Sequence, residues 1–180
     1  MMAQPDSRVR DILNAMAKVA RVASVMVDGD RASRIITDRA MHYLAHPDPD
    51  YRFLVGDYYD VDHDAFLHMK KMLLRLERLL DFPCSTALWV QVAGLEGYVT
   101  LVVQNGSVHR YYRFGQEKVQ LETEMAECIE SGQTIVVPVA HADQVLTVLA
   151  PVFDSLGDVV GVVEFSTWHP ASDSLPPAWS

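Results

Sequence analysis

Residues 131–167 read SGQTIVVPV (131–139), VLTVLAPVF (145–153), DSLGD (154–158) and VVGVVEFST (159–167), with the linker AHADQ (140–144) after the first run. Three of these runs are rich in β-branched residues, and the fourth is a short polar turn that contains Gly157. Such runs around a Gly turn are typical of antiparallel strands with a tight hairpin. The run VQLETEMAECIES (119–131) has a helical composition. The segment therefore predicts a helix that leads into three antiparallel strands.

Two more strands are predicted upstream, because the apolar period changes from that of a helix to two after Pro83. These strands are TALWVQVA (86–93) and YVTLVVQ (98–104), joined by residues 94–97. The dipeptide Asn105-Gly106 is a strong hairpin signal, so SVHRYYRF (107–114) is predicted as another strand. The chain is thus expected to contain an antiparallel sheet of five to six strands.

Three helices are predicted before the sheet. The first carries apolar residues at three-to-four spacing until Asp28-Gly29-Asp30 interrupts it, the second covers about 31–45, and the third covers about 63–81. The predicted fold class is α+β, with helices flanking the sheet. The predicted divisions are an N-terminal helical extension (1–62), a sheet domain (63–168) and an irregular tail (169–180).

Composition places the chain among ordinary globular proteins, since 49% of its 180 residues are hydrophobic and 22% are charged. The N-terminus has no apolar signal core, and no uncharged apolar run approaches the length of a membrane span. Cys84 and Cys128 are the two cysteines, which is typical of a reducing compartment. We therefore expect a cytoplasmic protein that does not enter a membrane.

The net charge of −9 is unevenly placed. Residues 82–180 hold Arg110, Arg113 and Lys118 against eleven acidic side chains, which gives −8, whereas residues 1–81 come to −1. An acidic sheet region disfavours contact with a phosphate backbone. We therefore expect no nucleic-acid partner.

From about residue 64 to 167 the order of elements resembles the GAF domain, and nearly as well the PAS domain. The positions that carry the resemblance are Gly132 after a helix, Pro151 in a strand, Gly157 in a turn and Gly161 in the last strand. The resemblance implies a non-enzymatic sensory or regulatory module that binds a small molecule. No kinase, cyclase or DNA-binding motif accompanies it, so we expect that the chain, if it is complete, signals in trans or simply binds.

The resemblance also implies where a ligand would lie, which is between the sheet and the helices that cover it. The polar and aromatic candidates in the strand-rich region are Trp89, Gln91, His109, Tyr112 and Glu164. Strand parity places Trp89 and Gln91 together on one face, opposite Leu88 and Val90. Gln91 and Glu164, as polar residues in otherwise apolar strands, could orient a ligand, but they also fit the solvent side of a half-buried sheet, which is the favoured interpretation. The cofactor, if there is one, stays unknown.

Two patterns in the sequence resemble metal sites, and each has a simpler explanation. His42 and His46 are four residues apart, but histidines in a last helical turn also interact favourably with the helix dipole. The run from Asp60 to Asp64 opens like a calcium loop but has Ala65 at position six and Lys71 at position twelve, so no metal site is predicted.

The leading hypothesis is a sensor that forms a homodimer through its N-terminal helices, because the first helix has a long apolar stripe. One alternative is a structural adaptor of the same fold with a filled core. A less favoured alternative is a thiol-based redox enzyme that uses Cys84 or Cys128, although Cys128 is expected to be a small buried hydrophobe.

Overall fold

The closing hairpin exists as the sequence predicted it. In the computed structural model, which describes residues 7–47, 61–105, 118–138 and 145–170, β5 (Val145–Phe153) pairs with β6 (Val159–Trp168) in antiparallel register. The turn between them is closed by the N–H of Asp154, which donates to the carbonyl of Asp158 at 3.0 Å. Gly157 has a φ of 90°, a conformation that favours glycine.

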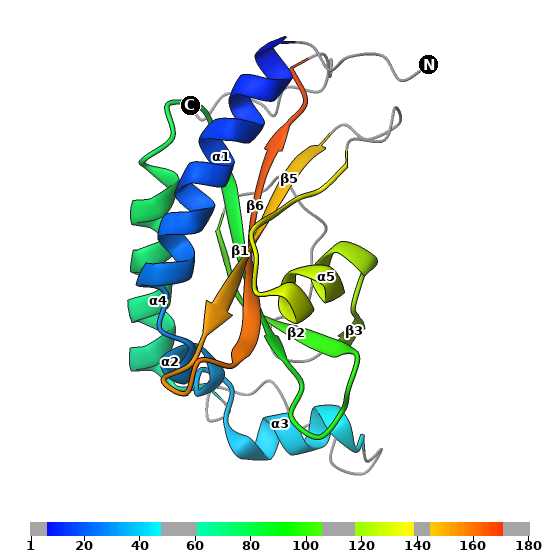
Figure 1. Ribbon diagram of the computed structural model, residues 1–180. Helices are drawn as coiled ribbons and strands as arrows, with labels where there is room; N and C mark the ends of the chain where they lie inside the picture. Colours follow the sequence, from blue (N-terminus) through cyan, green and yellow to red (C-terminus); the bar gives the residue numbers. More distant parts are fainter. Residues whose placement is uncertain (1–6, 48–60, 106–117, 139–144, 171–180) are drawn as a thin grey trace.

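The described strands form one antiparallel sheet of six strands, ordered β3-β2-β1-β6-β5-β4. The others are β1 (Ser85–Gln91), β2 (Tyr98–Asn105), β3 (Lys118–Gln120) and β4 (Ile135–Val136). The first and last long strands of the chain, β1 and β6, are therefore neighbours in the middle of the sheet. This arrangement, with helices on both faces, confirms the predicted α+β class (Figure 1).

Helices cover the two faces unequally. On one face lie α1 (Ser7–Met26), α2 (Gly29–Ser33) and α4 (His63–Glu77), while α5 (Thr123–Ser131) covers the other (Figure 1). A short helix, α3 (Asp38–Ala45), sits at one end of the sheet (Figure 1). None of the helices in the described ranges has both the length and the hydrophobicity of a membrane-spanning segment.

The predicted helix over 31–45 is wrong, because two short helices occupy this region. The first helix ends at Met26, just before Asp28-Gly29-Asp30 as predicted, and Asp28 also caps α2 by accepting a hydrogen bond from the N–H of Arg31 at 3.0 Å. Thr37 caps α3 in the same way. Between the two helices Ile36 forms an isolated antiparallel bridge with Val61, so its backbone is extended.

Two other boundaries differ from the prediction. The helix that begins after Asp62 ends at Glu77, four residues before the expected 81. Residues 118–120 form β3 on the edge of β2, so the following helix starts at Thr123 rather than at 119. The strand predicted over 107–114 lies outside the described residues.

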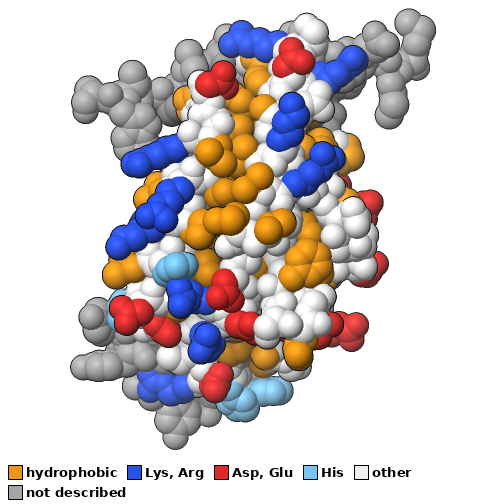
Figure 2. All heavy atoms as spheres, turned by 60° about the vertical axis from the view of Figure 1, so that its left-hand side comes forward, with side chains coloured by type: hydrophobic (Ala, Val, Ile, Leu, Met, Phe, Trp, Pro, Cys, Tyr) orange, Lys and Arg blue, Asp and Glu red, His pale blue; other side chains and the backbone are white. Residues whose placement is uncertain are grey.

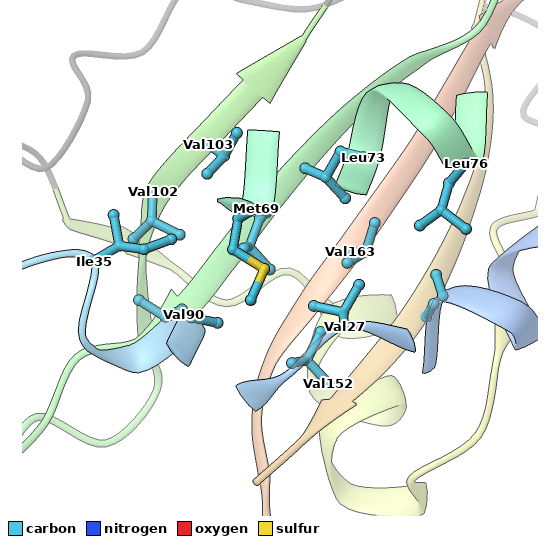
Figure 3. Packing of buried hydrophobic residues seen from close by; sticks show 14 of the residues in the cluster. Val27, Ile35, Met69, Leu73, Leu76, Val90, Val102, Val103, Val152 and Val163 are labelled. Carbon is cyan, nitrogen blue, oxygen red and sulfur yellow. The ribbon is translucent and has the colours of Figure 1, made fainter. Parts of the chain in front are cut away.

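The main core fills the space between the sheet and the layer of α1, α2 and α4. Figure 3 shows α4 side chains packed over the strands, together with Val27 and Ile35 from the N-terminal region. The labelled members are Val27, Ile35, Met69, Leu73, Leu76, Val90, Val102, Val103, Val152 and Val163. Burial of one such side chain stabilises the fold by about 1.5–3 kcal/mol.

The N-terminal helices belong to this same core. Met16 on α1 and Ile35 after α2 are fully buried, and α1 lies along β5. Residue 62 therefore does not coincide with a break in the packing. The divisions 1–62, 63–168 and 169–180 stay predictions, and most of the last one lies outside the described residues.

Candidate functional site

A second, smaller apolar cluster lies on the face of the sheet that α5 covers, and we call this face the α5 face. Its members come from α5 and from strands β1, β2, β5 and β6. They are Ala87, Trp89, Val99, Leu101, Met125, Cys128, Leu149 and Val162. Trp89 is the largest of them and is 5% exposed. Trp89 is buried because α5 packs over this face of the sheet.

The structure brings Trp89 and Glu164 together on this face. The indole Nε1–H of Trp89 donates to Oε2 of Glu164 at 2.8 Å. In the β1–β6 register Ala87 is opposite Glu164 and Trp89 is opposite Val162, so the two side chains are diagonal neighbours. This diagonal is within reach of a long aromatic side chain. Glu164 itself is half-buried.

Two hydroxyl groups extend this polar row across the sheet. Ser166, which is fully buried, donates from Oγ to Oε1 of Glu164 at 3.4 Å. The hydroxyls of Ser166 and Thr147 are also 3.4 Å apart. These contacts run from β1 through β6 to β5, and they fix the orientation of the Glu164 carboxylate within an otherwise apolar face.

Gln91 lies at the end of β1, on the same face as Trp89, but its amide has a different partner. Its Nε2 donates to the backbone carbonyl of Val159, at the start of β6. The side chain is half-buried. Gln91 thus links the end of β1 to the start of β6, next to the polar row.

The two remaining predicted site residues, His109 and Tyr112, lie outside the described residues. Their assignment to the site stays a prediction.

The two thiols are both free and both shielded. Burial raises the pKa of Cys84 to about 12, and the negative charge of Glu77 contributes in the same direction. Burial likewise raises the pKa of Cys128 to about 12. A reactive cysteine needs a lowered pKa, because the thiolate is the nucleophile.

The histidine pair and the acidic residues do not assemble into a metal centre in the described part of the chain. The rings of His42 and His46 lie 5.0 Å apart between centroids. Within the described ranges no group of three or more His, Cys, Asp or Glu side chains is placed to hold a metal ion.

A cleft that the sequence did not predict lies between α1 and the segment after α4. Its volume is about 370 Å³. Its lining residues are Asp11, Asn14, Ala15, Lys18, Val19, Leu79, Leu80 and Asp81. The polar residues at three-to-four spacing on α1 were a signal for it, but the part played by residues 79–81 depends on how α4 packs.

Comparison with known proteins gives matches at the level of structure only. No protein-family model and no curated protein matches the chain. Among solved structures it is similar to a GAF domain with 13% identity and a TM-score of 0.44, over 81% of both chains. It is also similar to the GAF domain of a two-component sensor histidine kinase from Bacillus halodurans, with 13% identity and a TM-score of 0.42, over 63% of this chain and 82% of that one.

A third match is a GAF domain from A. Aeolicus in an inactive state, with 14% identity and a TM-score of 0.40, over 73% of this chain and 78% of that one. These three solved structures are GAF domains, the class of domain that the sequence resembles.

Proposed function

We propose that this chain is a non-enzymatic sensory or regulatory module that binds a small molecule on the α5 face and signals through contacts between two copies. The observation that carries the ligand site is the Glu164 carboxylate, oriented by the buried indole of Trp89 within an apolar face. Ligand sites combine mainly apolar walls with a few placed polar groups. A carboxylate favours a cationic or hydrogen-bond-donating group, so we propose a ligand that carries an amine or a comparable donor.

The experiment is native mass spectrometry of the purified protein, together with its visible absorption spectrum. We expect a bound species whose occupancy falls by about tenfold in Glu164→Gln, since hydrogen bonds to a charged group are worth about 1.5–3 kcal/mol. Glu130→Gln, on the exposed side of α5, is the matched control and should keep the native occupancy. The absence of any bound mass and of any absorption band in the native protein would contradict the proposal.

A structural adaptor without a ligand is the second candidate, and the packing of the α5 face favours it. The members of the second cluster are buried and pack together beneath α5, which favours a filled apolar layer. The same mass spectra decide between the two candidates, because an adaptor carries no bound species in the native protein or in the Glu164→Gln variant.

Thiol-based catalysis is disfavoured by the state of both cysteines. A pKa of about 12 for each thiol leaves very little thiolate at neutral pH. Cys84 lies before β1 and Cys128 within α5, so the two are held in different elements.

Pairing of two copies is proposed through the outer surface of α1 and α4. Most of the long apolar stripe of α1 packs on β5 and so cannot contact a partner. What is left outside is a shorter set, composed of Val22, Val25 and Met26 on α1 and Leu67 and Leu74 on α4. Figure 2 shows apolar side chains in a band down this side of the molecule, with Lys and Arg on both sides of it.

The charges around this band predict how pairing responds to salt. Arg8, Arg10, Lys18 and Arg21 on α1 outnumber Asp11, so two copies that meet here bring like charges together. Salt screens such repulsion, whereas apolar contacts survive it. We therefore expect sedimentation to show more dimer at about 0.5 M than at about 0.05 M salt.

Val25 is 84% exposed, so Val25→Glu tests the surface without disturbing the fold. We expect this variant to be monomeric at all salt concentrations, while Leu156→Glu, at the equally exposed β5–β6 turn, still forms dimers. A native protein that stays monomeric at micromolar concentrations would contradict pairing without affecting the ligand proposal.

A further inference from the structure

Three polar side chains connect the end of α4 to the sheet on the face opposite α5. The hydroxyl of Thr86 on β1 donates to Oε1 of Glu77, the last residue of α4, at 2.5 Å. Nδ2 of Asn105, the last residue of β2, donates to Oγ1 of Thr86 at 3.3 Å. Thr86 and Asn105 are direct partners in the β1–β2 register. One helix and two strands therefore meet in a single hydrogen-bonded group.

This group is removed from water and is incomplete. Thr86 is 1% exposed and Asn105 is 5% exposed. In the described part of the chain, Oδ1 of Asn105 is buried and accepts no hydrogen bond. A buried polar atom without a partner costs free energy, so a donor that could reach it would stabilise the fold.

The environment of Glu77 favours the form of its carboxyl group that can supply such a donor. Burial raises the pKa of Glu77, and this effect exceeds the opposing effects of the hydrogen bonds from Thr86 and Asn105 and of the nearby Arg78 charge. The thiol of Cys84, just before β1, is a second titratable group near the Glu77 carboxyl, and the charge of Glu77 acts on its pKa. The groups that face it from the sheet, Thr86 and Asn105, carry no charge.

We propose that Glu77, Thr86 and Asn105 form a proton-responsive connection between α4 and the sheet, in which the protonated carboxyl of Glu77 donates a hydrogen bond to Oδ1 of Asn105. A carboxylic acid complements a carboxamide, because the acid O–H donates to the amide oxygen while the acid carbonyl accepts from the amide N–H. The proton comes from solvent and returns to it, and no other bond is made or broken.

The sign of the pH dependence follows from the direction of the shift. The folded pKa of Glu77 is raised, so the folded state binds the proton more tightly than the unfolded state does. The stabilisation by the neutral acid is complete below the unfolded pKa and is lost as the pH rises through the folded pKa. The end of α4 is thus held more firmly in acid than at neutral pH. This device lies on the opposite face from Glu164 and does not rest on the proposed ligand.

The direct test is a carbon-detected NMR titration of the side-chain carboxyls of the intact protein. We expect the midpoint of Glu77 to lie above 4.5, the ordinary value for this group. Thr86→Val removes a hydrogen bond that lowers the pKa, so it should move the midpoint further upward. A Glu77 titration midpoint at or below 4.5 in the native protein would overturn the proposal. This measurement is made on the native protein, so it does not depend on whether a variant folds.

Hydrogen exchange tests the mechanical consequence. After correction for intrinsic rates, we expect the amides of the last turn of α4 to exchange about threefold faster or more at pH 8 than at pH 4. Glu77→Gln cannot ionise and should abolish this pH dependence, whereas the exposed Glu130→Gln should keep it. An equal pH dependence in native protein and Glu77→Gln would contradict the connection.

Discussion

At the scale of the residue, Gly161 shows how closely the two central strands approach. A methyl group added there would lie 2.2 Å from the backbone carbonyl oxygen of Trp89 on β1, a contact that backbone atoms cannot relieve without moving. We expect Gly161→Ala to destabilise the protein by about 1–3 kcal/mol, measured by urea unfolding, because overpacking forces such shifts. It should also move the amide resonances of β1. Gly94 has nothing within 4 Å of an added methyl but has a φ of 78°, so Gly94→Ala should cost only backbone strain and lacks the contact that Gly161→Ala makes with β1.

The thiols allow a second prediction at this scale. Because burial raises the pKa of both Cys84 and Cys128 to about 12, we expect neither to react with iodoacetamide at pH 8 in the folded protein. Both should be labelled rapidly in denaturant, as mass spectrometry of the intact chain would show. Rapid labelling of the native protein at either position would revive the redox alternative.

The sequence predicts which residues share the α5 face but not which of them are in contact. Strand parity correctly put Trp89 and Gln91 on one face, because side chains alternate along a strand. The hydrogen bond from Trp89 to Glu164 joins residues 75 positions apart. It depends on β1 pairing with β6, and no local pattern in either strand specifies that partner.

At the scale of the element, the end of α5 depends on one left-handed residue. Gly132 has a φ of 61°, and its N–H donates to the carbonyl of Cys128 to close the helix. An added methyl would lie 3.5 Å from the Phe153 ring and 3.9 Å from the Val159 side chain, both ordinary contacts, so the cost of a substitution is in the backbone.

We therefore expect Gly132→Ala to lower the free energy of unfolding by about 1–2 kcal/mol, the cost of a left-handed conformation for a residue with a Cβ. Gly132→Asn should cost less, because Asn tolerates this conformation. Urea unfolding of the two variants side by side checks the order. Equal losses would show that space around the side chain, rather than φ, sets the cost.

A tertiary contact explains why the single helix predicted over 31–45 is wrong. The periodic apolar residues of 31–45 predict one helix, but the bridge between Ile36 and Val61 holds the backbone extended between α2 and α3. Val61 is 25 positions from Ile36 in the sequence, so no local pattern indicates the bridge. Ile35 and Ile36 are apolar because they are buried in the core, although they are not helical. Strands β1 and β2 were predicted well, since alternation and turn residues are local signals.

At the scale of the whole molecule, the sheet has two unequal apolar layers. The larger one needs α1, α2 and α4 together, and the smaller one needs α5. The sequence indicated α1, α4, α5 and most of the strands, and it predicts residues 1–62 to be an extension. It does so because an amphipathic helix has the same pattern whether it covers its own sheet or a partner. In the structure α1 packs on β5 and β6.

This assignment predicts that residues 63–170 do not fold alone. Without residues 7–47 the buried Met16 and Ile35 are missing, and the apolar face of β5 and β6 that α1 covers is exposed to water. We expect the chain 63–170 to bind a hydrophobic dye and to lack a cooperative urea transition, whereas the chain 7–170 unfolds in one step. Adding a peptide of residues 7–47 to the chain 63–170 should restore part of the transition. A cooperative transition of the chain 63–170 on its own, with an m value appropriate to its length, would show instead that the N-terminal helices are an extension free to serve a partner.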